Sequence, residues 1–189
     1  METMQFPETS RLQIELLSEQ DAHLLHELDQ DPEVMRFING GEPSSMEFIE
    51  ETYLPRLRAF SNPEEGWGLW KVIEKQSASF IGWILVRPLD FFSDKPTQLD
   101  NLELGWRFKR DSWGKGYATE AAQVVLDELK KNRENKYFSA LADEENTGSI
   151  NIMKKLGMDY LKTDICKDPL GDMSVVYYQM ANPNYQAPS

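Results

Sequence analysis

The sequence predicts one α/β domain, in which helices cover both faces of a mixed β-sheet. Segments with strand and helix patterns follow the order strand, two helices, three strands, helix, strand, helix and two strands. Apolar residues make up 40% of the 189 residues, enough for a core without metals or disulfides. No repeat or glycine–serine linker divides the chain. We therefore expect a single domain over residues 1–189, with its core at 9–181 and a loose tail at 182–189.

The fold is expected to begin with a strand and a helix. Leu12, Ile14 and Leu16 alternate with polar residues, which is the pattern of a half-buried strand. Ser18 is of a residue type that caps helices, and apolar side chains follow it at helical spacing. We expect this helix to end near Pro32, because proline does not continue a helix.

A second helix and a hairpin are expected next. Ser44 and Glu47 stand three residues apart, as in a capping box, and predict a helix that starts at Ser44. Pro55 should kink or split this helix. Residues 67–75 and 80–89 are two strand-like segments around a short polar turn, which predicts an antiparallel hairpin.

The second half of the chain alternates predicted strands and helices. Residues 99–109 have a strand pattern with Gly105 in its interior. The next helix has one apolar side, made by Ala118, Ala121, Ala122, Val125, Leu126 and Leu129. A short strand at 136–142 and a helix that ends at Gly157 follow. A strand pair within 159–180 completes the order.

Charge and cysteine content exclude several classes of protein. Lys and Arg total 20 against 32 Asp and Glu, so the net charge of −12 repels nucleic acid and anionic membranes and attracts a cationic partner. The longest apolar run, 80–86, is far too short to span a membrane, and the first residues do not resemble a signal peptide. Cys166 is the only cysteine, which favours a reducing compartment. We expect a cytoplasmic protein.

The segment "WGKGYATEA" places Gly114 and Gly116 around Lys115, between a predicted strand and a predicted helix. Glycines let backbone N–H groups turn toward a ligand, and the first N–H groups of a helix attract anions. A P-loop would need Ser or Thr after the lysine, and a dinucleotide-binding loop would need a third glycine where Thr119 stands. Both are excluded. The turn alone fits either a phosphate site or an ordinary left-handed turn with a solvated lysine.

Several segments in order resemble one family. The chain is similar to the GCN5-related N-acetyltransferases (GNAT), in the branch of the RimJ/RimL-like ribosomal-protein N-terminal acetyltransferases. "WGKGYA" resembles the family's [Q/R]-x-x-G-x-[G/A] motif, with Trp113 in the Gln/Arg place. "NLELGW" and "NTGSINIMKKLGM" resemble the branch's fourth strand and a later helix. "TSRLQIELL" resembles its first strand, although Glu15 stands where Arg is usual. The similarity covers about residues 9–181.

The resemblance implies a GNAT fold, whose fourth and fifth strands splay apart to admit acetyl-CoA. It implies that N–H groups from Gly114 through Ala118 bind the CoA pyrophosphate, while the main chain of Trp106 and Phe108 pairs with the pantetheine. A bulge is expected at Gly105, since glycine inside a strand often marks one. The implied acetyl-CoA-binding residues are Trp106, Phe108, Trp113, Gly114, Lys115, Gly116, Tyr117, Ala118 and Asn146.

Two side chains are candidates for catalysis by the same resemblance. Glu103 matches the branch's strand glutamate and would act as a general base through water; otherwise it is an outward carboxylate of an acidic chain. Ser149 matches the serine that protonates the CoA thiolate; otherwise it caps a helix. The wider family uses a tyrosine where Met153 stands, which moves the acid role toward Ser149. Asn146 is either a pantetheine contact or a plain helix cap.

The function implied is acetyl-CoA-dependent acetyl transfer to a primary amine, either a protein N-terminus or a small molecule. The alternative is a non-catalytic CoA-binding module of the same fold. His23 and His26 share a helix face without a third ligand, so no metal is expected. The protein would act as a monomer or homodimer. Residues 36–43 and 91–99 are the expected acceptor loops, and we expect Trp67 or Trp70 to border the acceptor cleft.

Overall fold

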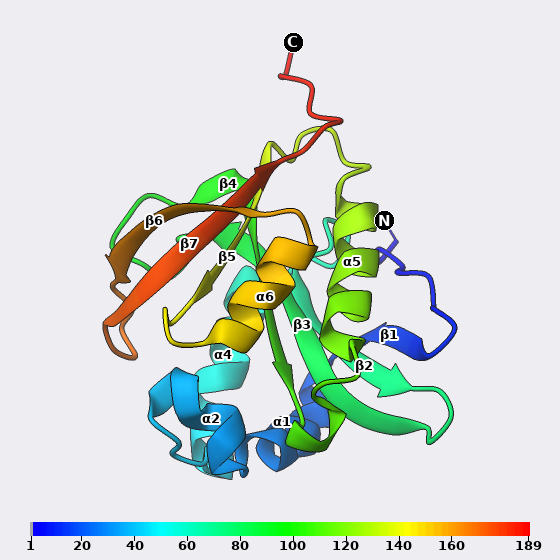
Figure 1. Ribbon diagram of the computed structural model, residues 1–189, viewed down its shortest axis with the longest axis vertical. Helices are drawn as coiled ribbons and strands as arrows, with labels where there is room; N and C mark the ends of the chain where they lie inside the picture. The colour runs from blue at the N-terminus through cyan, green and yellow to red at the C-terminus, as the bar shows by residue number, and fades with distance from the viewer. Residues whose placement is uncertain (1) are drawn as a thin grey trace.

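The computed structural model describes residues 2–189, which fold around one seven-stranded mixed sheet (Figure 1). The strand order is β1-β2-β3-β4-β5-β7-β6; β4 and β5 run parallel, and the other neighbours are antiparallel. This confirms the predicted mixed sheet, the predicted hairpin and the final strand pair. The strands are β1 (Leu12–Leu16), β2 (Gly68–Glu74), β3 (Ser79–Leu89), β4 (Gln98–Phe108), β5 (Tyr137–Ala142), β6 (Asp159–Cys166) and β7 (Met173–Ala181).

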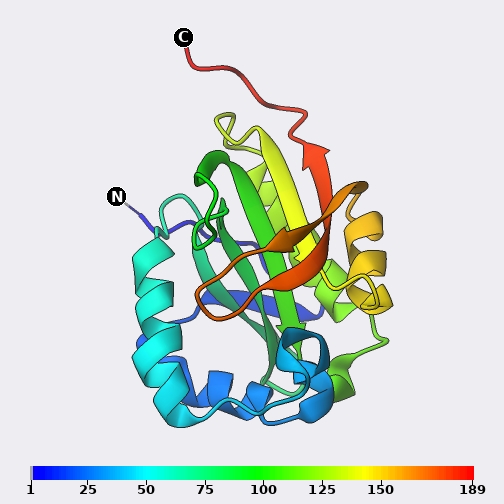
Figure 2. The same cartoon turned by 90° about the vertical axis from the view of Figure 1, so that its left-hand side faces the viewer.

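Helices cover both faces of the sheet, as Figure 2 shows. The amino-terminal helices pack on one face and the two later helices on the other. The first group is α1 (Ala22–Asp29), α2 (Pro32–Asn39), α3 (Met46–Phe48) and α4 (Leu54–Phe60); the second is α5 (Tyr117–Leu129) and α6 (Thr147–Lys155). Short 3-10 turns, η1 (Glu19–Asp21) and η3 (Arg110–Ser112), precede α1 and α5. None of the helices in this part of the chain is long and apolar enough to cross a membrane.

Each face of the sheet has its own core. On the α5–α6 face, Leu102 and Leu104 of β4 pack in one cluster with the buried side of α5, which confirms the predicted apolar side of that helix. On the opposite face, Trp83 of β3 packs with Leu57 and Phe60 of α4. Burying each such side chain contributes about 1.5–3 kcal/mol, so both helix layers are firmly attached to the sheet.

Helix α2 was not predicted. Helix α1 ends at Asp29, close to the end expected near Pro32, but Pro32 also starts a new helix. Asp31 caps this helix by accepting a hydrogen bond from the N–H of Glu33 at 3.0 Å. Proline suits the first helical position because its missing N–H would have no partner there. Gly40, with φ of 83°, ends the helix. Residues 36–43 are therefore not simply a loop.

The start of the second predicted helix is also corrected. Ser45, not Ser44, is the cap, and its Oγ accepts a hydrogen bond from the N–H of Phe48 at 3.0 Å. The Ser44 side chain is buried and donates to the Asp29 carboxylate at 2.7 Å. The capping box predicted at Ser44 was wrong. Either of the two adjacent serines could cap the helix, but Ser44 is buried against Asp29, which leaves Ser45 as the cap.

The predicted disturbance at Pro55 takes the form of a π-helical turn. This turn, η2 (Ile49–Tyr53), joins α3 to α4 without a break in the helical path. Proline lacks the N–H that would continue the regular ladder, and a wider turn just before it accommodates the missing bond. The helix is therefore modified at this point but is not split.

The parallel neighbours β4 and β5 pair over only three residues. The pairs are Asn101 with Tyr137, Leu102 with Phe138 and Glu103 with Ser139. β4 continues to residue 108 and β5 to residue 142, so the two strands diverge beyond Glu103. This confirms the predicted splay, which opens the middle of the sheet.

No bulge lies at Gly105. The pairing of β4 with β3 is regular there, with Gly105 opposite Leu85, and the register shifts instead between Pro88 and Leu89. Proline donates no ladder hydrogen bond, which makes Pro88 a natural place for the irregularity. The expected bulge at Gly105 was therefore wrong.

The segment after β7 contains no helix or strand. Its first residue, Asn182, is nevertheless buried, and its side-chain amide donates to the carbonyls of Lys130, Asn132 and Asn135. These bonds fasten the end of β7 to the end of α5.

Candidate active site

Two cavities meet where β4 and β5 part. The larger, about 650 Å³, lies against the starts of α5 and α6, and the smaller, about 350 Å³, lies mainly between the sheet and the α2–α4 layer. Both are lined by Trp106 and Arg107 of β4, Phe37 and Ile38 of α2, and Asn146 and Ser149 of α6. The splay therefore connects a site on one face of the sheet with a site on the other.

The turn before α5 has the backbone that the glycine pair predicted. Gly114 and Gly116 have φ of 75° and 78°, in the left-handed region where other residues are strained. Apart from Gly114 itself and its two neighbours in the chain, no atom of residues 2–189 lies within 4 Å of a Cβ built on Gly114; on Gly116 the nearest such atom is Arg11 Nη2 at 3.7 Å. Both glycines line the larger cavity beside the first N–H groups of α5. This arrangement suits a phosphate group.

Arg11 holds this turn from the other end of the sequence, a role that sequence reasoning missed. Its guanidinium donates to the Lys115 carbonyl at 3.0 Å and to Glu120 Oε1 at 3.0 Å, and it lies 4.3 Å above the Tyr117 ring. Thr9 Oγ1 donates to Glu120 Oε2 at 2.7 Å. The two residues, which lie just before β1, therefore fasten the turn and the first turn of α5 to the start of the first strand.

Of the nine residues expected to bind acetyl-CoA, all but Lys115 line the larger cavity. The Lys115 side chain is exposed. Trp113 is 48% exposed, and its indole N–H donates to the Phe108 carbonyl at 2.9 Å, which fixes the ring at the cavity wall. Tyr117 and Ala118 form the first turn of α5.

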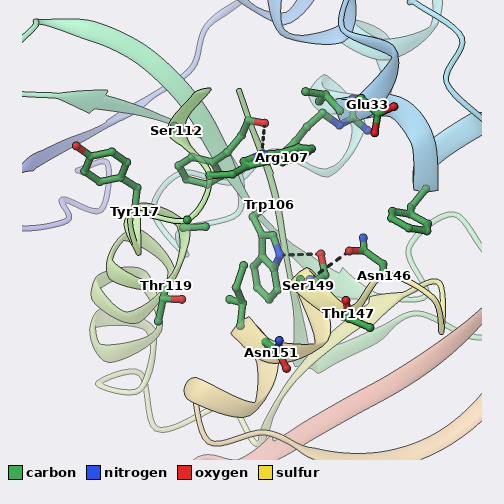
Figure 3. A pocket seen from close by; sticks show the side chains of 18 of the residues that line it. Glu33, Trp106, Arg107, Ser112, Tyr117, Thr119, Asn146, Thr147, Ser149 and Asn151 are labelled. Atoms are coloured by element: carbon green, nitrogen blue, oxygen red, sulfur yellow. Dashed lines mark hydrogen bonds between the residues drawn. The ribbon is translucent and has the colours of Figure 1, made fainter. Parts of the chain in front are cut away.

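Trp106, Ser149 and Asn146 form a hydrogen-bonded chain at the junction of the cavities (Figure 3). The Trp106 indole N–H donates to Ser149 Oγ at 3.2 Å, and the Ser149 N–H donates to Asn146 Oδ1 at 3.2 Å. Asn146 is thus the cap of α6, and it lines both cavities as well. Beyond Glu103, β4 is no longer paired with β5 in the described chain, so its edge on that side is available to an extended ligand.

Glu103 lines the smaller cavity, on the opposite face of β4 from Leu102 and Leu104. Its side chain is 13% exposed and forms an ion pair with Arg87, with Nε 2.9 Å from Oε2. Burial alone would lower the pKa of Arg87, but the Glu103 carboxylate, together with Tyr53 and Asp168, outweighs it and raises that pKa. Sequence reasoning missed this partner because Arg87 lies on another strand, and the pairing of the two strands brings the side chains together.

A second ion pair closes the smaller cavity on the side of the β6–β7 loop. Arg56 of α4 donates to both oxygens of Asp168, at 3.1 and 2.7 Å. Burial opposes ionisation of Asp168, but the hydrogen bonds from Arg56 and from the Leu170 N–H lower its pKa. This loop and α4 were not among the expected acceptor segments.

The aromatic residues of the smaller cavity also differ from expectation. Trp83 and Trp106 line it, whereas Trp67 and Trp70 are absent from its walls among residues 2–189. Trp70 is instead buried on the other face of β2. Within the expected loop 91–99, Phe91 and Phe92 pack edge-on against Phe60 of α4, which lines the smaller cavity.

Cys166 lines the smaller cavity, and burial raises the pKa of its thiol, so at neutral pH it is a thiol rather than a reactive thiolate. In residues 2–189 no group of three or more His, Cys, Asp or Glu side chains is arranged to hold a metal.

Comparison with known proteins gives consistent matches. Residues 11–159 match the family model described as "Acetyltransferase (GNAT) domain". The chain is 32% identical over 152 residues to an uncharacterized N-acetyltransferase, YnaD, of Bacillus subtilis (strain 168), covering 79% of this chain and 80% of that protein.

Solved structures share the fold. The crystal structure of an acetyltransferase (GNAT family) from Bacillus anthracis superposes with a TM-score of 0.72 at 25% identity, over 95% of this chain and 99% of that chain. A spermidine N-acetyltransferase from Vibrio cholerae, solved with CoA and spermine, superposes with a TM-score of 0.69 at 16% identity, over 94% and 99% of the two chains.

Proposed function

The chain belongs to the GNAT acetyltransferase family, and from this premise we propose that it transfers the acetyl group of acetyl-CoA directly to a primary amine bound in the smaller cavity. The observation that carries the proposal is the junction of the two cavities at the splay of β4 and β5. A donor on one face of the sheet can meet an acceptor on the other only through such an opening.

Acetyl-CoA fits the larger cavity by the chemistry of its walls. The left-handed turn at Gly114 and Gly116 and the first N–H groups of α5 provide donors for a pyrophosphate. The unpaired edge of β4 beyond Glu103 provides main-chain partners for the pantetheine amides. Lys115 is not required for this arrangement, because its main chain rather than its side chain forms part of the turn.

The acceptor must lose a proton to become a nucleophile. At pH 7, neutralising an α-amine with a pKa near 7.8 costs about 1 kcal/mol, and a lysine-type amine near 10.4 costs about 4.6 kcal/mol. Glu103 lines the smaller cavity and is the last residue of β4 that pairs with β5. We therefore assign its carboxylate the general-base role, through water. Its ion pair with Arg87 fixes the carboxylate in place.

The departing CoA thiolate needs a proton, and Ser149 is our candidate donor. Ser149 lines both cavities, and its Oγ already accepts a hydrogen bond from Trp106, which leaves its own O–H to point elsewhere. The wider family's tyrosine position holds Met153, which is 1% exposed in the core and has no acidic proton. Serine is therefore the better candidate in this chain.

The acceptor class follows from the resemblance to the RimJ/RimL-like branch, which supports either a protein N-terminus or a small-molecule amine. "WGKGYATEA" before α5 and Met153 in α6 support that branch. The lone Cys166 supports a reducing, cytoplasmic location.

The test is release of free CoA thiol from acetyl-CoA by the purified protein in the presence of amine panels. Glu103→Gln and Ser149→Ala should each lower kcat by about 10²–10⁴-fold, the usual contribution of a positioned acid or base. Both variants should still bind CoA. Tight CoA binding with the same turnover in wild type and both variants would instead identify a non-catalytic CoA-binding module.

A further inference from the structure

Strand β6 leaves one edge of the sheet open. It stands at the end of the strand order, beside β7, and in the described chain no strand pairs with its outer edge (Figure 1). The unpaired N–H and C=O groups of such an edge can bind another strand. The opposite edge strand, β1, buries its apolar side chains Leu12 and Ile14, whereas the side chains of β6 are mostly exposed. The β6 edge is therefore open and accessible.

Exposed apolar side chains gather on β6 and in the loop that follows it. Tyr160, Leu161 and Ile165 are 57, 52 and 52% exposed, and Leu170 is 53% exposed. These four are half of the large apolar side chains that residues 2–189 expose. Apolar residues that gather in this way mark an interaction surface, whereas singly scattered ones do not.

The charged side chains of β6 are balanced and accessible. Lys162 and Asp164 are each 44% exposed. Asp164 Oδ2 accepts hydrogen bonds from Lys95 Nζ at 2.9 Å and from Lys162 Nζ at 3.5 Å. The second contact is long and exposed, so it holds Lys162 only weakly, and a carboxylate has lone pairs for a further donor. Although the chain has a net charge of −12, residues 159–167 contain two lysines and two aspartates and have no net charge.

The sequence of β6 is complementary to itself when a second copy runs antiparallel. With Thr163 opposite Thr163 of the second copy, Lys162 lies opposite Asp164 and Leu161 lies opposite Ile165 of that copy. Each contact occurs twice, because a twofold axis at Thr163 relates the two copies. Opposite charges and apolar side chains that lie directly across an antiparallel pair stabilise it.

Other registers of the same pair are unfavourable. An axis moved by one residue places Lys162 opposite Lys162 or Asp164 opposite Asp164, and like charges at this distance are destabilising. An axis moved by half a residue places a charge opposite an apolar side chain, either Asp164 opposite Leu161 or Lys162 opposite Ile165. The pattern of β6 therefore favours a single register.

Two features of β6 are also typical of edge strands that avoid pairing, namely a lysine and a bulge. The bulge lies between Tyr160 and Lys162, and the pairing with β7 is regular from Lys162 to Cys166. The centre of the antiparallel pair, at Thr163, is thus on the regular part of the strand. The lysine meets a carboxylate of the second copy, so it selects one register and does not exclude them all.

From this pattern we propose that β6 pairs antiparallel with β6 of a second copy, which joins two sheets into one across a twofold axis at Thr163. Two contacts between Lys162 and Asp164 flank the axis, and Leu161 and Ile165 pack at either end. The proposal does not depend on acetyl transfer. Cys166, the last residue of β6, lines the smaller cavity, so the interface ends beside that cavity in each copy.

Sedimentation equilibrium from micromolar to submillimolar concentrations measures the association. Wild type should form a dimer. Lys162→Asp places two aspartates opposite each other on both sides of the axis, so the dissociation constant should rise about tenfold or more. Lys131→Asp is the matched control: it reverses an exposed lysine that pairs with Glu128 near the end of α5, and it should leave the dissociation constant unchanged.

A mixture of two variants tests the register. Asp164→Lys alone places two lysines opposite each other and should also weaken the dimer. Mixed with Lys162→Asp chains, it should form a heterodimer in which every contact across the axis again joins opposite charges. Lys95 loses its partner in Asp164→Lys both alone and in the mixture, so recovery on mixing reports the contact between the copies.

A cysteine at the axis tests its position. Opposite residues of an antiparallel pair have Cα atoms about 4.5–5.5 Å apart, which a disulfide can span. Thr163→Cys in a Cys166→Ser background should therefore form a covalent dimer on mild oxidation. Wild type should not, because Cys166 would lie opposite Tyr160 of the second copy, roughly 20 Å along the strand from the Cys166 of that copy.

The outcomes are distinct. A wild-type protein that remains monomeric at submillimolar concentration overturns the proposal. A dimer that is unaffected by Lys162→Asp overturns the β6 interface, and so does a mixture that associates no better than its two components. A cross-link through Cys166 but not through Thr163→Cys overturns the register. Release of CoA thiol tests the proposed function separately from all of these.

Discussion

At the scale of single residues, the direction of one hydrogen bond defines the chemistry at the junction. The Trp106 indole nitrogen can only donate, so Ser149 Oγ must accept in the 3.2 Å bond between them. The Ser149 hydroxyl proton is then available to a different acceptor. Asn146 uses its Oδ1 for the Ser149 N–H, which holds the serine at the start of α6. The residue is therefore positioned by two neighbours and retains its own donor.

The glycine turn gives the first prediction. Gly114→Ala places a side chain at φ of 75°, which costs roughly 1–2 kcal/mol in the left-handed region. The backbone should relax away from this conformation, so the CoA dissociation constant should rise about tenfold, as measured by calorimetric titration. Gly157→Ala is the control: φ is 92° there, but the residue lies outside the cavity walls. It should lose similar stability and keep its CoA affinity. Equal CoA affinity in wild type and Gly114→Ala would contradict the role of the turn.

Arg11 gives the second prediction. Arg11→Met removes the donors to the Lys115 carbonyl and to Glu120, so the turn should loosen and the KM for acetyl-CoA should rise about 3- to 10-fold with little change in kcat. Steady-state kinetics measure both constants. Arg58→Met, which breaks an exposed pair with Glu19, is the control and should change neither. A lower kcat at constant KM would argue against a purely positioning role.

Residue by residue, local signals could be read from the sequence and distant partners could not. Gly114 and Gly116 were predictable because a positive φ depends on the residue itself. Two interactions join residues that are far apart along the chain: the ion pair of Glu103 with Arg87, and the hydrogen bond of Arg11 to Glu120. Their pairing exists only once the sheet is assembled, and neither residue type nor spacing encodes it.

At the scale of elements, the strands and later helices followed from periodicity, whereas α2 did not. The signal for α2 was present: Asp31 before Pro32 is a cap followed by a favoured first residue. It was taken as the end of α1 because proline both stops and starts helices. The splay of β4 and β5 was predicted from the family resemblance, and no residue type or spacing within either strand indicates it.

The Arg56–Asp168 pair, between α4 and the β6–β7 loop, gives the third prediction. Asp168→Asn removes the charge but keeps the shape, so the loop should open more often and the KM for the amine acceptor should rise several-fold at pH 7. Stability should fall by about 1 kcal/mol. An unchanged acceptor KM would show that the loop does not form a functional wall.

The pH dependence of this pair has a definite sign. The folded state lowers the pKa of Asp168, so its contribution is fully present above the ordinary carboxyl pKa of about 3.9 and is lost as pH falls through the folded value. Urea unfolding of wild type and Asp168→Asn should therefore differ at pH 7; the difference should begin to shrink near pH 4 and vanish only below the lowered pKa of Asp168. A difference that persists at acidic pH would point to another origin.

At the scale of the whole molecule, the sheet lies between the two cavities. Helices α5 and α6 cover one face of the sheet and the α2–α4 layer covers the other (Figure 2). The larger cavity lies against α5 and α6 and the smaller one mainly under the α2–α4 layer, so under the proposed function donor and acceptor would meet only at the splay. The net charge of −12 suggested a cationic acceptor, but the charged residues that line the smaller cavity balance, with Arg56, Arg87 and Arg107 against Glu103, Asp143 and Asp168, so the local charge differs from the total. Net charge describes long-range encounter, whereas selectivity depends on the side chains in the cavity.

The fourth prediction concerns the whole fold. CoA at about 100 times its dissociation constant should stabilise the native state by about 2.7 kcal/mol, which for a chain of this length raises Tm by roughly 5–10 °C. Ser149→Ala should show nearly the same shift, because the hydroxyl is assigned to chemistry rather than to binding. Thermal denaturation with and without CoA measures both. A shift that disappears in Ser149→Ala would move that residue from catalysis to binding.

The attachment of the cofactor turn to Thr9 and Arg11 has a practical consequence for anyone who shortens or tags this protein. A truncated chain that begins at Leu12 would lack both side chains that fasten the turn and the start of α5. It would also lack Phe6, which is buried in the core with its ring centroid 4.5 Å from that of Trp70. Amino-terminal trimming should therefore weaken coenzyme binding and lower stability together, whereas Arg11→Met leaves Phe6 in place and separates the two effects.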